Sequence, residues 1–329
     1  MTRFRPVYWP ALVAILIVIA TIAVTRGAVQ LSLRVVFDAL RGTGDPTAIA
    51  IVRDLRLPRV LLGALVGAGL GASGAVLQGA LRNSLAEPYL LGVSGGAAVG
   101  AVLAFTLGGT REPVITLAAF AGGVAAVFVA LAVSRAGARG ARVDLRTLLI
   151  AGVIVGAFAN AAIMVALASA APNTVRGALW WMMGSAADAT WARVVWLALS
   201  VALAGGALIY RAREIDVLAL GEDTAASLGV DAERAGKRAF VLAALLAAAT
   251  VAAAGLIGFV GLVVPHIARG MGLRAHRPLM LAASLIGAML VVAADLAART
   301  VAAPTELPLG AITALLGVPF FLVQLRRLT

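Results

Sequence analysis

Long apolar stretches alternate with short polar ones along almost the whole chain. Runs of about twenty apolar residues match the ~30 Å of hydrocarbon that a transmembrane helix must cross. Lipid offers no partner to their backbone groups, so each run predicts an α-helix. The ten predicted spans cover residues 7–25, 58–80, 90–108, 114–133, 147–170, 192–210, 239–256, 258–273, 280–298 and 308–325.

The polar segments between the runs predict the orientation. The first run follows Arg3 and Arg5, but it is longer than the apolar part of a signal peptide and no clear cleavage site follows it, so we expect an uncleaved span. An even number of spans puts both termini on one side. If that side is the cytoplasm, most of the 27 Lys and Arg residues fall in cytoplasmic loops. The exceptions, Arg53, Arg56 and Arg59, cluster on the outside, just before the second span.

Glycines give a second pattern. In two spans they recur every fourth residue, which favours close helix packing over direct substrate contact: Gly63, Gly67 and Gly71, then Gly92, Gly96 and Gly100. Gly255, Gly258 and Gly261 with Pro265 weaken a helical ladder instead. They predict a break or re-entrant joint between the seventh and eighth spans.

Composition agrees with a polytopic membrane protein and excludes several classes of site. The chain is 62% hydrophobic, with a mean hydropathy of +1.03. The absence of cysteine excludes disulfides, thiolate nucleophiles and Cys-ligated metals, and two histidines argue against a His-based metal centre. The net charge of +12 resides in short runs between spans, so we expect no nucleic-acid partner.

One loop, residues 211–238, is unusually polar and contains GEDTAASLGVDAERAGKR. Glu222 and Asp223 suit the first turn of a short helix, Gly229 suits its end, and a second short helix is expected from Asp231. The first helix presents a small apolar face that no other loop is large enough to cover, made of Ala225, Ala226 and Leu228. The loop is therefore either a knob for a cleft on a soluble protein or a solvated connection.

The chain resembles the FecCD-type permease family, the membrane subunits of ABC importers for ferric siderophores, haem and cobalamin. The similarity runs from about Leu31 to Arg327. It rests on LRLPRVLLGALVGAGLGASGAVLQGALRNSLAEPYLLGVSGGAAVG (55–100), LLIAGVIVG (148–156), WWMMGS (180–185), GEDTAASLGV (221–230), GFVGLVVPHIARG (258–270), ADLAART (294–300) and ELPLGAITALLGVPFFL (306–322). It implies an all-α type II ABC importer permease fold with a single transmembrane domain over 1–329.

The resemblance implies that the helices at about 215–238 couple the chain to a cytoplasmic ATP-hydrolysing subunit. The coupling residues would be Gly221, Glu222, Asp223, Ala225, Leu228 and Gly229. The chain has no GxxxxGK[ST] phosphate loop, because Gly236-Lys237-Arg238 lacks the first glycine and the Mg²⁺-binding hydroxyl. We expect a transport subunit that is not an enzyme and has no cofactor, with ATP and Mg²⁺ on the partner subunit.

The resemblance also implies an outer docking site and an inner gate. Exposed arginines would receive acidic residues of a periplasmic substrate-binding protein: Arg53, Arg56, Arg59 and Arg299, the last with an ion pair to Asp295 as alternative or addition. The inner gate would comprise Gln78, Asn83, Ser84 and Leu85 with Asp144 and Leu145. Most relatives have proline where this chain has Ser84, and Asn83 suits a helix cap equally well. Asn160 and Met164 are pathway candidates, although Asn160 also suits an interhelical hydrogen bond, and His266 suits a hydrogen-bonded interfacial residue.

These features predict a homodimeric permease in the bacterial inner membrane that works with two ATPase subunits and a binding protein on a bulky metal chelate. Which chelate is carried is not indicated. An ion-coupled secondary transporter is a rival, but its spans would need ionisable residues, and Asp295 near a span end is almost alone. A remote alternative is an intramembrane serine protease, since Gly71-Ala72-Ser73-Gly74 copies a GxSG motif with His266 as base.

Overall fold

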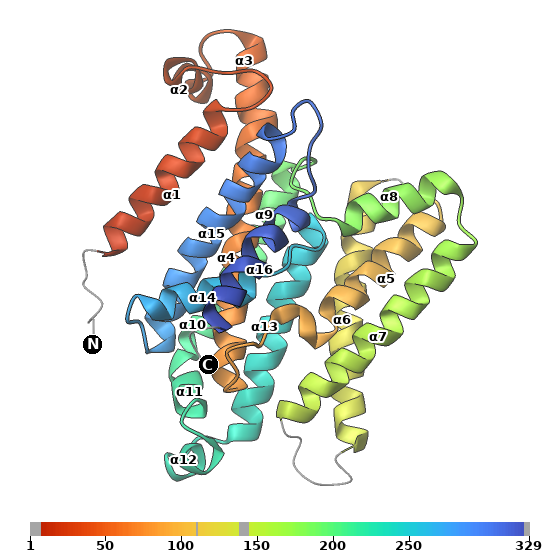
Figure 1. Cartoon of the computed structure of the whole chain (residues 1–329), viewed down its shortest axis with the longest axis vertical. Helices are drawn as coiled ribbons and strands as arrows, with labels where there is room; N and C mark the ends of the chain where they lie inside the picture. The colour runs from red at the N-terminus through yellow and green to blue at the C-terminus, as the bar shows by residue number, and fades with distance from the viewer. Residues whose placement is uncertain (1–7, 110, 138–144, 326–329) are drawn as a thin grey trace.

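The computed structural model describes residues 8–109, 111–137 and 145–325, which contain helices and loops but no strand (Figure 1). In chain order the helices are α1 (Tyr8–Thr25), α2 (Leu33–Arg41), α3 (Pro46–Ala50), a π-helical segment (Ile51–Arg56), α4 (Leu57–Ala80), a 3₁₀ turn (Pro88–Leu91), α5 (Val93–Thr106), α6 (Glu112–Gly137), α7 (Leu145–Ala168), α8 (Pro172–Met182), α9 (Trp191–Ser200), a second π-helical segment (Val201–Gly205), α10 (Gly206–Tyr210), α11 (Ala212–Leu218), α12 (Glu222–Ser227), α13 (Ala232–Ala254), α14 (Val260–Gly270), α15 (His276–Thr300) and α16 (Leu309–Leu325).

Each predicted apolar segment contains a helix, so the all-α polytopic fold is confirmed. Within the described residues, seven helices are long and apolar enough to cross a membrane. The other three predicted spans are shorter helices, namely α5, α14 and α16. The sequence patterns missed α2, α8 and α11, because these helices are short and stand in the polar segments between spans.

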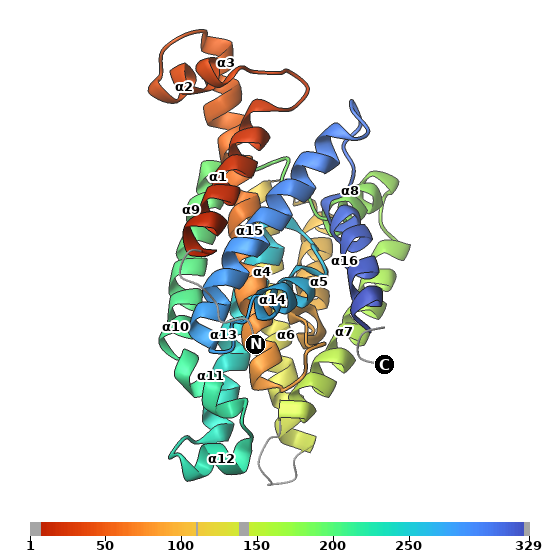
Figure 2. The same ribbon diagram turned by 60° about the vertical axis from the view of Figure 1, so that its left-hand side comes forward.

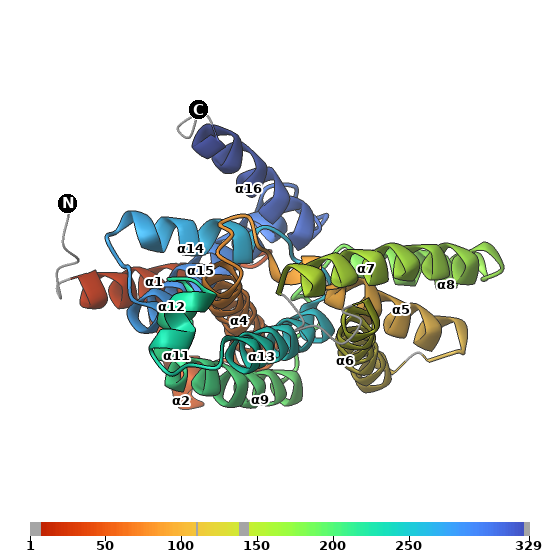
Figure 3. The ribbon, with the colours of Figure 1, turned by 90° about the horizontal axis from the view of Figure 1, so that it is seen from below.

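The core is built around α4, which packs against α13, α14 and α15 (Figure 3). Its glycines allow this packing. A Cβ on Gly67 would overlap the carbonyl oxygen of Gly287 on α15, and one on Gly71 would overlap that of Ala283. A Cβ on Gly63 would meet Val291 at an ordinary 3.7 Å. The predicted packing role is confirmed for Gly67 and Gly71.

A second group of helices, α5, α6 and α7, lies beside this core, and α13 contacts both groups (Figures 1 and 3). Gly96 and Gly100 make the α5–α6 contact possible. A Cβ on Gly96 would overlap the carbonyl oxygen of Gly122, and one on Gly100 would overlap that of Ala118. The second glycine stripe therefore also serves helix packing.

The helix containing α4 begins far earlier than predicted. Pro46 opens it behind the cap Asp45, whose Oδ2 accepts a hydrogen bond of 2.8 Å from the N–H of Ala48. The helical path then runs without interruption from Pro46 to Ala80, 35 residues in all. The outer arginines therefore lie on this same helix, which extends the predicted span toward the N-terminus.

The predicted joint between the seventh and eighth spans is confirmed. α13 ends at Ala254, Gly255 has a φ of +72°, and α14 starts after Phe259, whose φ is +67°. A phenylalanine in the left-handed region is uncommon and needs support from its surroundings. The support comes from Glu87, in the turn after α4, whose side chain accepts a hydrogen bond from the N–H of Phe259.

The polar loop folds into α11 and α12 and then runs into α13. Asp231 caps α13, accepting a hydrogen bond of 3.1 Å from the N–H of Arg234. The expectation of a second short helix at this point is wrong, because the helix that starts here continues for 23 residues through the apolar segment to Ala254.

Candidate functional site

The predicted knob lies at one end of the molecule, which we call the α12 end, and α2 and α3 lie at the opposite, α2 end (Figures 1 and 2). Gly221, with a φ of +112°, precedes α12, and the exposed Glu222 and Asp223 occupy its first turn, where acidic groups complement the helix dipole. Gly229, with a φ of +76°, ends it. The N–H of Val230 bonds to the carbonyl of Ala225 at 2.9 Å, a Schellman closure. The predicted start and end of α12 are confirmed.

The apolar face of α12 differs from the prediction. Ala225 is 0% exposed and faces the protein, so the expectation of an uncovered face is wrong for Ala225, whereas Ala226 and Leu228 are exposed as expected. The helix is slightly shorter than two turns, and α11 and α13 contact it. Leu220 and Leu228, at 64% and 59% exposure, are the large apolar side chains that flank it. The exposed knob is therefore two acidic residues between two leucines.

The turn after α4 lies at the same end. Arg82 has a φ of +49°, and a Cβ on Gly221 would lie 3.4 Å from its Nη1, so the turn touches the start of α12. Asn83 Oδ1 accepts a hydrogen bond of 2.9 Å from the N–H of Leu85, which makes the side chain a brace of the turn. Ser84 and Leu85 are exposed. The knob and the predicted gate turn are thus adjacent.

Two residues that were not among the predicted gate residues connect this turn to the α13–α14 joint. Glu87 Oε1 accepts a hydrogen bond of 2.8 Å from the N–H of Phe259, and the Tyr89 hydroxyl accepts one of 2.8 Å from the N–H of Ile257. Burial raises the pKa of the Glu87 carboxyl, an effect that the Phe259 hydrogen bond opposes. An acidic residue followed by proline in an apolar surrounding was the available signal.

Gln78 is buried and holds the same region together from α4. Its Nε2 donates to the carbonyls of Gly261 and Leu262 at 3.3 and 3.2 Å, and its Oε1 accepts from Arg269 Nη1. Pro88 packs tightly against Gly261, where a Cβ would lie 2.6 Å from its Cδ. The turn, the joint and α14 therefore form one connected unit.

The remaining gate and pathway candidates lie on or next to α7. Asp144 lies outside the described residues, and Leu145 is the first residue of α7. Asn160 and Met164 are both exposed, Met164 by 73%, on a face of α7 that turns away from the rest of the chain. Within the part of the chain that the structure describes, Asn160 therefore forms no hydrogen-bonding link to another helix.

The arginines at the α2 end are not the free guanidiniums that the sequence suggested. Arg56 is only 7% exposed, and it donates to the backbone carbonyls of Val24 and Thr25 at 2.7 and 3.1 Å and to that of Val29. Arg53 donates to the carbonyl of Leu40 at 2.6 Å. These arginines hold the ends of α1 and α2 against the helix that continues into α4. They can do so because the last carbonyls of a helix have no partners within it.

The other two arginines share one buried carboxylate. Arg59 Nε lies 3.0 Å from both oxygens of Asp295, and its Nη1 and Nη2 donate to the two oxygens of Glu306 at 2.8 and 3.0 Å. Arg299 Nε lies 3.5 Å from Asp295 Oδ2, which confirms the predicted ion pair, and its Nη2 donates to the carbonyl of Ala23. The expectation of exposed guanidiniums is wrong for Arg56, Arg59 and Arg299.

The structure argues against both rival hypotheses, the intramembrane serine protease and the ion-coupled transporter. Ser73 is buried and its hydroxyl donates to the carbonyl of Ala243 at 2.8 Å, so it is a packing residue of the α4–α13 contact. Asp295 is already neutralised by Arg59 and Arg299, which leaves little charge to bind a coupling ion. His266 packs edge-on against Phe320, and the expected hydrogen bond is missing at Nδ1, which has no partner in the described structure. No group of metal-ligating side chains occurs among the described residues.

A profile of the FecCD transport family matches residues 15–327. The cobalamin import system permease protein BtuC of Halobacterium salinarum is 44% identical over 281 residues, covering 85% of this chain and 74% of that protein. The hemin transport system permease protein HmuU of Yersinia pestis is 38% identical over 96% of this chain and 94% of its own. A solved structure of a metal-chelate type ABC transporter in an inward-facing conformation superposes with a TM-score of 0.88 at 28% identity, covering 98% of this chain and 100% of that one.

Proposed function

The chain belongs to the FecCD transport family of ABC importer permeases, and we propose that it carries a bulky metal chelate, such as haem, a ferric siderophore or cobalamin, into the cytoplasm. The observation that carries this proposal is that the fold superposes over 98% of the chain on a metal-chelate type ABC transporter and presents an exposed knob at α12. Such a permease is a transport subunit, and its work must come from outside the chain.

The energy source that we propose is a separate ATP-binding subunit seated on α12. The chain has no phosphate-binding loop of its own, and ATP and Mg²⁺ would be held by that partner. The knob offers Glu222 and Asp223 for basic or polar groups, and Leu220 and Leu228 for an apolar cleft. Exposed leucines beside charged residues suit a docking contact, since large apolar side chains gain free energy when another protein covers them.

The membrane orientation proposed from charge puts the α12 end and both termini in the cytoplasm of a bacterium, with the chain in the inner membrane. The basic loop residues gather at this end, among them Arg82, Arg211, Arg213, Arg274 and Arg277. Positive residues are retained on the cytoplasmic side during insertion. The α2 end then faces the periplasm.

We propose that two copies pair and that the chelate passes between them along α7. The exposed face of α7 supports this path, because it combines large apolar residues with one amide: Ile150, Val153, Ile154, Phe158, Asn160, Met164 and Val165. A polar side chain in hydrocarbon requires a partner or water. Asn160 would obtain one in a pathway and not against lipid.

At the α2 end we propose docking of a periplasmic substrate-binding protein. Arg56 and Arg299 are occupied by backbone carbonyls, so they shape this surface rather than receive a partner directly. Arg59 pairs with the half-exposed Glu306. It could exchange this carboxylate for one of the binding protein, since a guanidinium forms the same bidentate pair with either carboxylate. Arg53 is half-buried and lies nearby on the same helix.

At the opposite end the turn of Asn83, Ser84 and Leu85, with Asp144 and Leu145 of the neighbouring segment, would form the cytoplasmic gate. Because Arg82 touches the start of α12, movement of the knob by the ATPase would pull on this turn. The Glu87–Phe259 hydrogen bond would pass the movement to the α13–α14 joint. This chain of contacts is the coupling route that the geometry supports.

The test is uptake into vesicles reconstituted with the permease, its ATPase subunit and its binding protein. Hemin and cobalamin are offered separately, with ATP inside the vesicles or with a proton gradient alone. We expect uptake of a chelate that depends on ATP and on the binding protein. Uptake driven by the proton gradient without ATP would contradict the proposal.

A further inference from the structure

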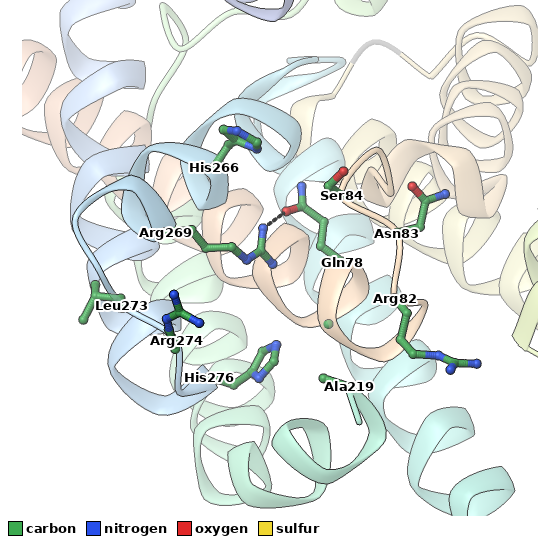
Figure 4. A pocket seen from close by; sticks show the side chains of 11 residues that line it. Gln78, Arg82, Asn83, Ser84, Ala219, His266, Arg269, Leu273, Arg274 and His276 are labelled. Atoms are coloured by element: carbon green, nitrogen blue, oxygen red, sulfur yellow. Dashed lines mark hydrogen bonds between the residues drawn. The ribbon is translucent and has the colours of Figure 1, made fainter. Parts of the chain in front are cut away.

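A pocket at the α12 end carries a concentration of positive charge that transport of a chelate does not require. It has a volume of about 520 Å³, within the ~300–1,000 Å³ range of ligand pockets, and lies between the turn after α4, the end of α11, and the α14–α15 connection (Figure 4). Arg82, Arg269, Arg274, His266 and His276 line it, and no acidic residue is among the described residues that do so.

The basic residues come from separate elements that border the pocket, with Arg269 and Arg274 on one side and Arg82 on the other, its guanidinium directed away from them (Figure 4). Arg82 stands on the left-handed residue of the turn, Arg269 on α14, Arg274 in the connection, and His276 at the first position of α15. Gln78 fixes Arg269 by accepting from its Nη1, and a guanidinium has five N–H donors in all. A single Arg–carboxylate pair needs only one such group, so this arrangement suits an anion with several acceptor oxygens.

His276 supplies an independent indication that a ligand is missing. The residue is 4% exposed, and its Nδ1 and backbone N–H both contact Asp216 Oδ1 at 2.7 Å. Its buried Nε2 has no hydrogen-bond partner within the described structure, and the ring points into the pocket (Figure 4). Buried polar atoms are normally satisfied, so this orphaned nitrogen at the pocket wall calls for an acceptor or donor from outside the described residues.

Gly79 leaves the space that the His276 ring occupies. A Cβ on Gly79 would overlap His276 Nε2, so only glycine leaves room for the imidazole at the pocket wall. Asp216, the acid that orients the ring, lies on the far side of the imidazole and does not line the pocket. The arginines that line the pocket therefore have no counter-charge among its described lining residues.

We propose that this pocket binds a phosphate group, supplied by the headgroup of an anionic lipid or by free phosphate. Phosphate offers several oxygens to the guanidiniums of Arg269 and Arg274, and basic pockets between helices at the cytoplasmic membrane surface are a recognised arrangement for anionic headgroups. The bound group bridges the gate turn, α14 and α15 next to α12. It thereby braces the region through which the coupling helix acts.

The experiment measures thermal unfolding of the full chain in detergent with inorganic phosphate, and in nanodiscs of phosphatidylcholine with or without phosphatidylglycerol. Wild type is compared with Arg82→Gln/Arg274→Gln, two exposed pocket residues. The control is Arg213→Gln/Arg277→Gln, which removes two exposed arginines from the same end outside the pocket. All three proteins are also titrated for bound phosphatidylglycerol by native mass spectrometry.

If the headgroup is the source, phosphatidylglycerol raises the melting temperature of wild type and control, and the pocket variant loses about tenfold or more in apparent affinity. If free phosphate is the source, inorganic phosphate alone gives this pattern in detergent. No protection by either anion, or equal affinity of the pocket variant and the control, overturns the proposal. If the double variant does not fold, Arg274→Gln and Arg277→Gln are compared singly with the same criteria.

Discussion

The Glu87 side chain accepts a hydrogen bond of 2.8 Å from the backbone N–H of Phe259, across 172 residues of sequence. Phe259 has a left-handed backbone, and its N–H would otherwise be without a helical partner at the start of α14. One acidic side chain thus stabilises a strained joint and ties it to the turn that we assign to the inner gate.

Glu87→Ala should lower the melting temperature and the rate of chelate uptake, because the part-buried N–H of Phe259 then has no acceptor. Leaving such a group unsatisfied costs about 1–3 kcal/mol. Glu87→Gln keeps an acceptor oxygen in the same place and should retain most of the stability. Thermal unfolding of the two variants in one detergent decides the matter, and equal losses in both would exclude the role of the hydrogen bond.

The glycine stripe of α4 predicts opposite outcomes at neighbouring positions. Gly67→Ala forces α4 away from the carbonyl of Gly287, and overpacking of this kind costs about 1–3 kcal/mol. Gly63→Ala meets only Val291 and Val292 at 3.7 and 3.8 Å and gains helix propensity of about 1 kcal/mol. Melting temperatures should fall for the first and stay or rise for the second. The reverse order would show that the α4–α15 contact is looser than described.

Arg56 is expected to be a structural residue. Arg56→Gln cannot reach all three carbonyls that the guanidinium satisfies, and hydrogen bonds to charged groups contribute about 1.5–3 kcal/mol each. The melting temperature should drop clearly, whereas Arg34→Gln, an exposed arginine at the same end, should leave it unchanged. Similar melting curves for the two variants would count against this assignment.

The Arg59–Glu306 pair predicts a pH dependence. The hydrogen bond with Arg59 lowers the pKa of the Glu306 carboxyl, against an opposing effect of burial. A carboxyl whose pKa is lowered in the folded state adds stability above its unfolded pKa of about 4.3, and this is lost as the pH falls through the folded value. The difference in melting temperature between wild type and Glu306→Gln should therefore be present at pH 7 and shrink below about pH 4. A difference that does not change with pH would contradict the pairing.

The parts of the fold that follow from local pattern could be predicted from the sequence. Gly255, Gly258 and Gly261 with Pro265 indicated the joint, and Glu222, Asp223 and Gly229 indicated both ends of α12, because backbone freedom and helix dipoles act within a few residues. Asp45-Pro46 also carried a helix-start signal. The apolar-run criterion passed over it, since the first turns of that helix are polar.

The partners of the arginines could not be predicted in this way. Arg56 is buried by carbonyls more than 25 residues earlier in the chain, and Arg59 is paired with residues of α15 and the segment after it. Charge at a span end indicates exposure only when tertiary structure offers no acceptor. The burial of Ala225 has a different origin, because the helices that contact α12 are its sequence neighbours α11 and α13, and the angle at which they fold against it is not given by local pattern.

The central claim is that work enters this permease through the knob at α12. The most direct test is the double variant Glu222→Arg/Leu228→Asp, purified with its ATP-binding subunit. The control Asp54→Arg/Leu33→Asp makes the same kinds of change at exposed positions of the α2 end. We predict that both variants keep the melting temperature of the wild type, and that only the α12 variant loses the co-purifying subunit and its ATP hydrolysis. Full retention of the subunit and of ATP hydrolysis by the α12 variant would contradict the account.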